Sequence, residues 1–536
     1  MRFARPHPNR KSAVVLALLG VGIAASQGAI AQEAILNGLG WLTARPGSEV
    51  DSRTRATVTD NRAPAEVSAS GGKAGAGLGV AASAKLIATA QANTLGLSAL
   101  QASNSQVSVL QNQVQGFVSA VGGAATANTA LLSGGTSRRP MTDSRVLVSG
   151  NRASNVESIG AEGTIGLGAV GSLQLPGRST ANSVLTDESD LRRVQMSVTD
   201  NKADGVQSVG GAALANASTL ARSNAEDLNI VQGNNTARDV RAGGGSGSVG
   251  AGFVAEADLT GVAAANSFAA AGSQLKGARI TQQSNDVNGM WATGGSALGN
   301  SVSFGDYTGG DLRQYQALQT GNRATKIEAG GGSGSLLKGA LAEVQASAAA
   351  LANSISVQKG DLKGATQHTV TGNTANSVQA VGGAAAANSI WLQDSTASRS
   401  NVTVTGNTAQ DINTAGGRAT IGGGVVGDFE RSGRAVANSL ALDNRSTLDN
   451  VPVTITRNTA RAVQGAGGLA AANSAMLSDA RYKNSTLNLS GNTAENVRAN
   501  GFSNSVGGGL GCSNKQSAIA LANSLGVFGS DVEAPT

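Results

Sequence analysis

Few side chains in this sequence have the types and spacing that catalysis or metal binding requires. Cys512 is the only cysteine, which excludes an internal disulfide and a cysteine-based zinc site. The two histidines are His7 and His368. His7 falls in the leader segment described below, so no convincing Ser-His-Asp arrangement can be assembled. His368 sits in a Gln-His-Thr triplet just before an expected strand, and we interpret it as a solvent-facing strand residue rather than a catalytic base.

Two further candidates have simple structural interpretations. The carboxylates between Asp187 and Asp190 could contribute to a calcium site, but the nonapeptide repeat of calcium-bound β-rolls is missing, which favours an acidic loop. Cys512 follows Gly-Leu-Gly, and we expect a small buried residue there, although an exported unpaired thiol could also join two chains. The sequence therefore predicts no catalytic residue, no metal ligand and no cofactor.

The N-terminus has the features of a secretory signal peptide. Four basic residues lie within the first eleven positions, and residues 13–25 form an apolar segment of about a dozen residues that is short for a membrane span. Ala29-Ile-Ala31 matches the small-residue cleavage signal. We therefore expect residues 1–31 to be removed after Ala31, so that the mature chain begins at Gln32. No later segment is apolar for long enough to cross a membrane.

Charge and composition exclude several classes of protein. Without the leader, 36 basic residues face 34 acidic ones, a net charge of +2, so the high pI is no argument for nucleic-acid binding. Aromatic residues make up 3% of the chain, and glycine occurs 74 times. Large side chains are therefore too few for an ordinary globular core. Backbone hydrogen bonding between stacked repeats is the alternative source of stability.

Two asparagine landmarks alternate along the mature chain. The first follows a short alternating run, usually as Gly-Asn-Thr-Ala, and the second lies in Ala-Asn-Ser or a close variant. The first series comprises Asn61, Asn112, Asn151, Asn201, Asn235, Asn285, Asn322, Asn373, Asn407, Asn458 and Asn492. The second series comprises Asn93, Asn128, Asn182, Asn216, Asn266, Asn300, Asn353, Asn388, Asn438, Asn473 and Asn523.

The spacing of the landmarks defines a double repeat. The interval from the first to the second landmark alternates between a long one, as from Asn151 to Asn182, and one of about half that length, whereas the return interval is nearly constant. A long and a short unit together span about 85 residues, as from Asn322 to Asn407. The long units carry an additional segment, such as 420–429, which is expected to form an extra solenoid turn or a small hairpin. We divide the chain into a leader (1–31), a lead-in (32–55), a β-repeat array (56–530) and a tail (531–536).

The repeat unit has the pattern of β-strands. Apolar and polar residues alternate in 402–405 and 453–456, and a Gly-Asn or similar turn follows. A second strand is expected across 375–380, and a third runs through Ala-Asn-Ser into 390–392. These features predict an all-β repetitive β-solenoid, and an extended array of antiparallel hairpins is the alternative. Dividing 85 by five suggests coils of about 17 residues, hence roughly 28 coils and a length of about 130 Å.

The asparagines themselves have two possible roles. Equivalent residues of stacked coils touch, so asparagine above asparagine can form an amide ladder. Alternatively, the asparagines only occupy turns, and the turn role is the safer interpretation.

The leader, the Gly-Asn-x-Ala motifs and the Ala/Gly/Asn/Ser bias resemble those of Gram-negative β-repeat surface proteins. That group includes proteins that anchor holdfasts and the curli-type fibre subunits, and the resemblance covers nearly all of the mature chain. It implies an exported structural protein, either an adhesin or a holdfast- or fibre-associated attachment component. The 85-residue double period and the lack of regularly placed glutamine depart from the curli pattern, which puts amyloid assembly in doubt.

A carbohydrate-active β-helix enzyme, a lyase or a hydrolase, is the alternative function. Such enzymes cluster acidic, basic and aromatic residues on one face, whereas Trp41, Trp291 and Trp391 are widely separated here. We expect the protein at the cell surface, outer-membrane associated or extracellular, with the periplasm as a further possibility. The expected partners are a surface polysaccharide or an outer-membrane anchoring or secretion protein, with self-association possible and no nucleic acid.

Overall fold

The fold is described from a computed structural model of the chain. Residues 31–533 are described except for 37–38, 44–48, 51–54, 65, 71–73, 77–78, 85–86, 99–100, 122, 134–139, 160–162, 166–167, 174–176, 210, 244–247, 250–253, 258–260, 294, 306–310, 331–347, 382, 416–426, 430–432, 444, 467, 501–511 and 515–517. The leader interpretation of residues 1–30 therefore lies outside the described residues. Ala31 is the first residue of strand β1 (Ala31–Leu36).

A regular coil of the array consists of five short strands. In one coil these are β49 (Ala384–Ala387), β50 (Ile390–Gln393), β51 (Thr396–Ser398), β52 (Asn401–Thr405) and β53 (Thr408–Ala415). Two residues separate most consecutive strands, so the chain turns sharply and returns to its starting side. The alternating segment expected at 402–405 lies in β52, and that expected at 375–380 lies in β48 (Thr374–Val381).

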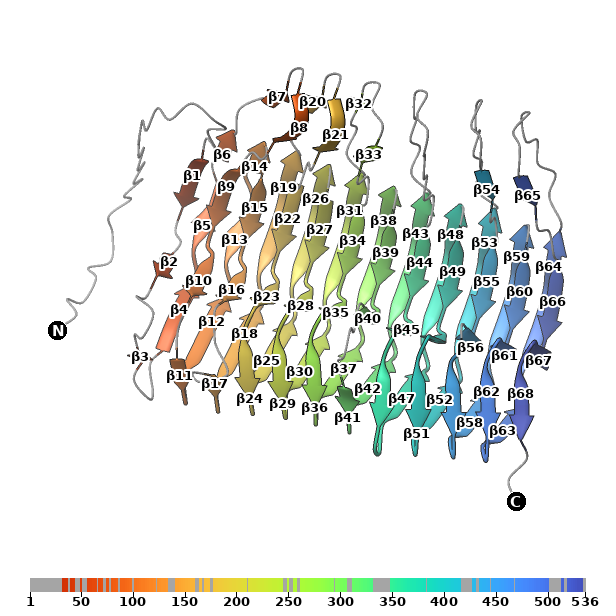
Figure 1. Cartoon of the computed structure of the whole chain (residues 1–536). Helices are drawn as coiled ribbons and strands as arrows, with labels where there is room; N and C mark the ends of the chain where they lie inside the picture. The colour runs from red at the N-terminus through yellow and green to blue at the C-terminus, as the bar shows by residue number, and fades with distance from the viewer. Residues whose placement is uncertain are drawn as a thin grey trace.

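Successive coils stack into five long parallel sheets, here named A to E in chain order (Figure 1). Sheet A runs from β1 to β66 (Ile519–Ala522), sheet B from β2 (Leu39–Thr43) to β67 (Leu525–Phe528) and sheet C from β3 (Glu49–Val50) to β68 (Asp531–Glu533). Sheet D runs from β4 (Arg55–Thr59) to β63 (Thr486–Ser490), and sheet E from β5 (Arg62–Ala63) to β64 (Thr493–Asn500).

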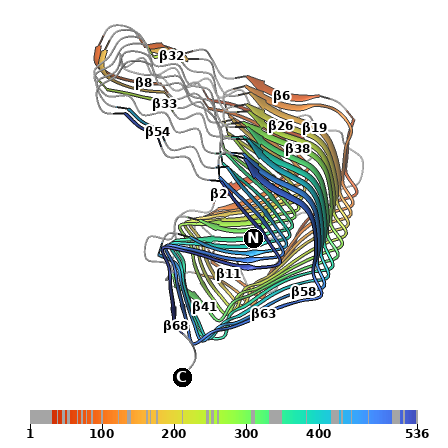
Figure 2. The ribbon, with the colours of Figure 1, turned by 90° about the vertical axis from the view of Figure 1, so that its right-hand side faces the viewer.

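The pairing identifies the fold as a β-solenoid. The strands of β48 and β53 pair in parallel with equivalent residues aligned, for example Ala375 with Ala409 and Val378 with Ile412. All strand pairs in the described residues are parallel, so the predicted all-β solenoid is confirmed and the antiparallel hairpin array is excluded. Figure 2 shows the coils lying over one another when viewed along the stack.

The coil is larger than expected from the sequence. Equivalent asparagines in successive coils are 35 residues apart from Asn353 to Asn388 and 50 apart from Asn388 to Asn438. The double repeat therefore contains two coils, not five. Sheets A, B and C hold twelve strands each, so the body is about 53 Å long at about 4.8 Å per coil. The expected length of about 130 Å is wrong, because strand periodicity does not report how many strands complete one turn.

Left-handed residues make the corners of each coil. All described asparagines of the second series have φ between 48° and 51°, at the corner between sheets A and B. In the first series the residue before the asparagine takes this conformation, for example Asp200 (φ 57°) and Gly406 (φ 64°). Asparagine, aspartate and glycine tolerate positive φ. The strand expected to run through Ala-Asn-Ser is therefore two strands, β49 and β50, separated by a corner at Asn388.

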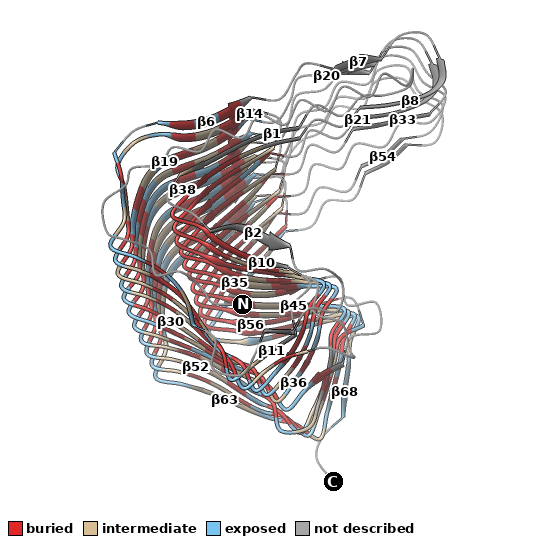
Figure 3. Cartoon of the chain, turned by 90° about the vertical axis from the view of Figure 1, so that its left-hand side faces the viewer, coloured by how far each residue is buried: buried red, intermediate tan, exposed pale blue. Residues whose placement is uncertain are grey.

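The interior has two compartments. One lies among sheets B, C and D and holds large side chains such as Phe268, Leu392 and Ile455. The other lies between sheets A and E and holds mostly alanine and valine, such as Ala385 and Val378. Figure 3 shows buried residues on inward-facing positions along the whole stack. The abundance of alanine follows from the narrow space between sheets A and E, which favours small side chains.

The long coils differ from the short ones between sheets E and A. Strands β20 (Gly163–Ile165) and β21 (Gly168–Leu173) lie in one such segment, and β54 (Gly427–Phe429) lies in another. β20 pairs in parallel with β7 (Ala74–Ala76), and β21 pairs with β8 (Gly79–Ala84), although each pair belongs to coils two steps apart. The additional segments therefore pair with one another outside the five main sheets.

Both ends of the expected array extend into neighbouring segments. Strands β1, β2 and β3 fall at or within the segment treated as a lead-in and pair with the second coil in sheets A, B and C. Strand β68 falls within the expected tail and pairs with β62 (Arg481–Lys483).

Candidate functional site

The first asparagine series forms a buried hydrogen-bond ladder at the corner between sheets D and E. The backbone N–H and Nδ2 of Asn151 both donate to Oδ1 of Asn201, at 3.0 and 3.1 Å. Nδ2 of Asn201 donates in turn to Oδ1 of Asn235, at 3.1 Å, and to the carbonyl oxygen of Val148. The same pattern continues through most of the series to Asn492.

The second series forms a parallel ladder at the corner between sheets A and B. Nδ2 of Asn216 donates to Oδ1 of Asn266 at 2.9 Å, and Nδ2 of Asn388 donates to Oδ1 of Asn438 at 3.0 Å. Nδ2 of Asn216 also donates to the backbone carbonyl of Thr236, the first residue of a sheet E strand, at 2.9 Å. These bonds join the two corners across the solenoid.

The asparagine ladders are therefore structural. Most of the asparagines in both series are fully buried, so they are not available to a ligand. Turn formation and ladder formation both occur, since the second-series asparagines adopt positive φ and also stack. The number of residues from a second-series asparagine to the next first-series asparagine is nearly constant. This segment runs from the A/B corner through sheets B, C and D to the D/E corner.

His368 is buried rather than solvent-facing. The side chain occupies an inward position of β47 (Gln367–Thr371), aligned with Ala317 and Val402 in the neighbouring coils. Its Nδ1 lies 3.0 Å from the hydroxyl of Tyr315, and burial lowers the pKa of His368 to about 4. The alternation of the strand starts one residue earlier than expected, which places His368 on the inner face.

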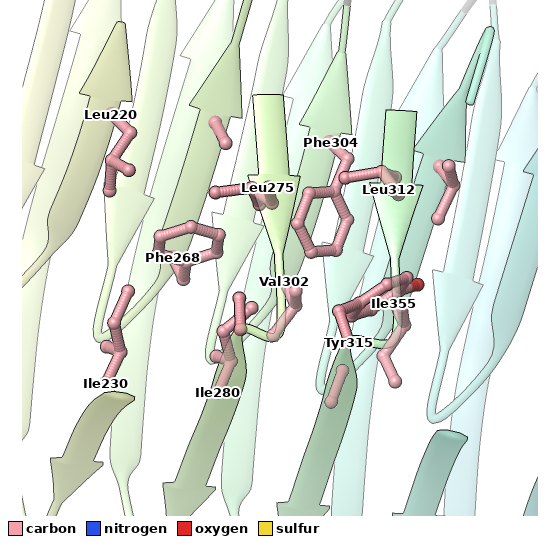
Figure 4. Close-up of a cluster of buried hydrophobic side chains, with 14 of the residues drawn as sticks. Leu220, Ile230, Phe268, Leu275, Ile280, Val302, Phe304, Leu312, Tyr315 and Ile355 are labelled. Carbon is pink, nitrogen blue, oxygen red and sulfur yellow. The ribbon is translucent and has the colours of Figure 1, made fainter. Parts of the chain in front are cut away.

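Tyr315 and His368 end a row of buried rings. The rings of Phe268 and Phe304 lie 5.7 Å apart, and those of Phe304 and Tyr315 lie 5.1 Å apart. Figure 4 shows this row between leucine, isoleucine and valine side chains of adjacent coils. Bulky rings thus fill the interior of consecutive coils in the middle of the array, where most other coils use aliphatic residues.

A glutamine ladder lies in the same region and was not anticipated from the sequence. Nε2 of Gln282 donates to Oε1 of Gln232 at 2.7 Å, and Nε2 of Gln319 donates to Oε1 of Gln282 at 2.9 Å. All three side chains are fully buried. The fourth position of the alternating run is usually valine or isoleucine. Glutamine at this position in three successive coils is the sequence signal that could have indicated the ladder.

The acidic segment at 187–190 forms a surface corner between sheets B and C. Asp187 and Glu188 pair with the guanidinium of Arg222 at 2.8 and 3.0 Å, and Asp190 accepts a hydrogen bond from Asn224. The carboxylates are thus used in contacts with the adjacent coil. No group of three potential metal ligands occurs in the described residues. The side chain of Cys512, in β65 (Cys512–Asn514), lies outside the described residues.

Trp41 and Trp391 lie on strands at distant points of sheet B, and Trp291 lies on sheet E. Trp291 is 43% exposed on the outer face of sheet E. Trp391 lies on sheet B, where its Nε1 donates to Oδ2 of Asp443 at 2.8 Å and Arg434 pairs with the same carboxylate. Burial raises the pKa of Asp443 despite this guanidinium. Trp391, Asp443 and Arg434 thus form one contact on sheet B, and Trp291 lies apart from it on sheet E.

One corner departs from the regular pattern. The corner between β46 (Asp361–Lys363) and β47 contains three residues, whereas the corresponding corners on either side contain two. The additional residue is Ala365, which is exposed. Gly364 before it has φ 84°, and a Cβ atom there would lie 3.1 Å from Cγ of Gln314.

An open pocket of about 410 Å³, here called the corner pocket, lies at this irregular corner. Its lining consists of Gln316, Ala365, Thr366, Gln367, Arg399, Ser400, Asn401, Asn450 and Pro452. Gln316, Gln367 and Asn401 stack at the same position of three successive sheet D strands. The hydroxyls of Thr366 and Ser400 are buried and hydrogen-bonded to each other. The lining contains four side-chain amides and one guanidinium but no carboxylate.

Threonine columns continue the polar surface from the pocket along sheet D. Thr369 aligns with Thr403, and Thr403 aligns with Thr454 of β58 (Pro452–Thr456). A second column contains Thr405 and Thr456, whose hydroxyls lie 3.0 Å apart. Hydroxyl groups thus recur at the spacing of the coils, about 4.8 Å. Together with the pocket they form a polar face on sheet D.

None of the described segments is a helix long and apolar enough to span a bilayer. No protein-family model, curated protein or solved structure matches the chain. The surface chemistry of the solenoid is therefore the feature from which a function can be inferred.

Proposed function

We propose that this chain is an exported structural protein of the cell surface that attaches to a surface polysaccharide. The polar face and corner pocket on sheet D are the observation that carries this proposal. Amide and hydroxyl side chains that recur at a fixed spacing suit a polymer, because one sugar chain can make the same hydrogen bonds on successive coils. The expected setting is the outer membrane or the extracellular space, as an adhesin or a holdfast- or fibre-associated component, held by an anchoring or secretion partner.

The composition of the pocket supports binding rather than cleavage of the sugar. Glycoside hydrolysis normally requires two carboxyl groups flanking the bond, separated by about 5 to 9.5 Å. The pocket lining has no aspartate or glutamate. A carbohydrate-active enzyme is therefore the weaker candidate at this site.

A pair of two-coil deletions tests the attachment proposal. Deleting residues 202–285 joins Asn201 to Asp286, and deleting 323–407 joins Asn322 to Thr408. Both deletions connect positions that are equivalent in sheet E and remove one long and one short coil. The first deletion retains the corner pocket, whereas the second removes most of it.

We expect cells carrying the first deletion to attach nearly as well as the wild type, and cells carrying the second to lose most attachment. Small-angle scattering should show both mature proteins folded and shortened by about 10 Å, the height of two coils. Normal attachment by a strain that lacks the whole protein would refute the proposal.

We also propose that the protein self-associates end to end. Leu525, Val527 and Val532 continue inward-facing columns but are 43%, 41% and 50% exposed at the last coil. Sheet D ends at β63, which leaves a strand edge beside them. The unpaired strand edge and the exposed apolar residues of this coil favour association with another chain. The ladder has a direction, since each asparagine N–H donates toward the C-terminal neighbour, so Asn492 would donate to Asn61 of a second copy.

A further inference from the structure

The electrostatics of the corner pocket define its ligand more closely. This argument builds on the proposed attachment function. The charged group in the lining is Arg399, and the remaining polar groups are neutral. Arg399 is exposed and forms no ion pair within the described part of the chain. Arg279, at the same strand position as Gln316 in the preceding coil, is also exposed. The nearby carboxylate of Asp449 accepts a hydrogen bond from Asn484.

At the equivalent corner of an earlier coil, the arginine is paired with a carboxylate. Arg193 also occupies the left-handed corner between sheets C and D, with φ 51° against 53° for Arg399. Its Nε and Nη2 donate to the carboxylate of Asp143 at 2.6 and 2.8 Å, and the hydrogen bond from Arg193 lowers the pKa of Asp143. Asp143 lies in the preceding coil at the same corner. At the corner of Arg399 the preceding coil has Gly364 and the following coil has Asn450, so neither equivalent position carries a charge.

The inserted residue and a proline keep this corner open. Gly364 has no side chain to stack against Arg399, and Ala365 adds one residue to the chain between β46 and β47. In neighbouring coils the first residue of the sheet D strand donates its N–H to the corner carbonyl, as Asn401 does to Thr366 at 2.9 Å. Pro452 occupies that position one coil later and has no N–H, so the carbonyl of Ser400 lacks this donor. The pocket therefore presents one cation together with a backbone acceptor and amide groups.

We infer that the corner pocket binds the carboxylate-bearing sugar unit of an acidic polysaccharide, a uronic acid residue. Arg399 would bind the carboxylate, because a planar guanidinium can donate two parallel hydrogen bonds to the two carboxylate oxygens. The amides of Gln367 and Asn401 would bond ring hydroxyls, and the Ser400 carbonyl would accept from one of them. A single guanidinium balances one negative charge, which favours a carboxylate over a doubly charged phosphate.

Binding of defined oligosaccharides to the mature protein tests this inference. The probes are tetrasaccharides of galacturonate and mannuronate, their neutral methyl esters, and inorganic phosphate. We expect at least one acidic tetrasaccharide to bind, its methyl ester to bind at least tenfold more weakly, and affinity to fall as salt is raised. Failure of both acidic probes, equal binding of the esters, or tighter binding of phosphate would overturn the inference.

Two variants and a matched control locate the site. Arg399→Gln should weaken binding of the acidic tetrasaccharide at least tenfold, and Arg193→Gln, at the equivalent corner outside the pocket, should leave it unchanged. Deleting Ala365 should restore a two-residue corner and abolish binding while leaving the circular dichroism spectrum unchanged. Equal affinity of Arg399→Gln and wild type would refute the role of Arg399. If deleting residues 323–407 abolishes attachment but Arg399→Gln does not change it, the proposed attachment function holds. In that case only the assignment of a uronic acid ligand is refuted.

Discussion

The hydroxyl of Tyr315 lies 3.0 Å from Nδ1 of His368, and the two residues come from adjacent coils in the middle of the array. Both side chains are fully buried. A histidine in this position must stay neutral, because its charged form would have to be desolvated. The stability of the solenoid should therefore depend on pH through this residue.

His368 should destabilise the fold as the solution becomes acidic. Its pKa is lowered to about 4 from 6.5, with desolvation as the cause. Below pH 6.5 the unfolded chain takes up a proton that the folded chain binds only near pH 4. The contribution of His368 is therefore complete above pH 6.5 and is lost progressively down to pH 4, by about 3 kcal/mol in all. Urea unfolding of wild type and His368→Val should show a flatter pH dependence in the variant, and parallel curves would contradict this.

A fourth glutamine should extend the glutamine ladder by one coil without a large loss of stability. Oε1 of Gln319 is buried without a hydrogen-bond partner, and Val370 aligns with Gln319 in the next coil. Val370→Gln supplies an Nε2 donor to that oxygen, so we expect the free energy of unfolding to stay within about 1 kcal/mol of wild type. Val404→Gln, one coil further, buries an amide beside valine and isoleucine and should lose about 2 kcal/mol or more. Equal losses in chemical denaturation would show that the ladder does not extend.

The asparagine ladder should contribute strongly to stability at each step. Oδ1 of Asn285 accepts from both the backbone N–H and Nδ2 of Asn235, at 3.1 Å each. Asn285→Ala leaves these buried donors unpaired and should reduce the free energy of unfolding by about 2–3 kcal/mol. Asn488→Ala, on the exposed side of β63, should change it by no more than about 0.5 kcal/mol. Similar values for the two variants would argue against the ladder.

Ala462 should be replaceable with a gain in stability. It lies within β59 (Thr459–Ala466) with φ 52°, where the adjacent coils have Asp411 and Asn496. Alanine is strained in the left-handed region, so Ala462→Gly should raise the free energy of unfolding by about 0.5–1 kcal/mol. Ala460→Gly, on the buried inward side of the same strand, should lower it, because a packed methyl group is lost. Thermal unfolding of the two variants would reveal any departure from these opposite shifts.

The exposed C-terminal end should control association. Val527→Lys places a charge among the exposed apolar residues of this coil and should abolish assemblies larger than one chain. Leu318→Lys introduces the same side chain at a residue that is 36% exposed on the flank of sheet D and should leave assembly intact. Light scattering after size-exclusion chromatography across a concentration series measures both. A wild-type protein that remains monomeric at every concentration would exclude self-association through this end.

The sequence by itself determined the all-β class, the double repeat and the corner that follows the alternating strand. Alternation in segments such as 402–405 specifies strands, because inward and outward side chains alternate along a strand. Gly-Asn marks the corner that follows, because glycine and asparagine tolerate positive φ. The corner at Ala-Asn-Ser was expected to be continuous strand, and only the structure shows it as a corner. The period of the double repeat follows directly from the spacing of Asn322 and Asn407.

Only the tertiary structure decided how many strands complete a coil and which side chains lie next to one another in neighbouring coils. Five strands return to the starting side because each corner turns the chain by an amount that local sequence does not encode, so the coil size expected from the sequence was wrong. The burial of His368 depended on a one-residue shift of strand register, which moves a side chain to the opposite face. The corner pocket likewise depends on Ala365, Arg399 and Pro452, which are separated in sequence and meet only because parallel stacking aligns equivalent corners of three coils.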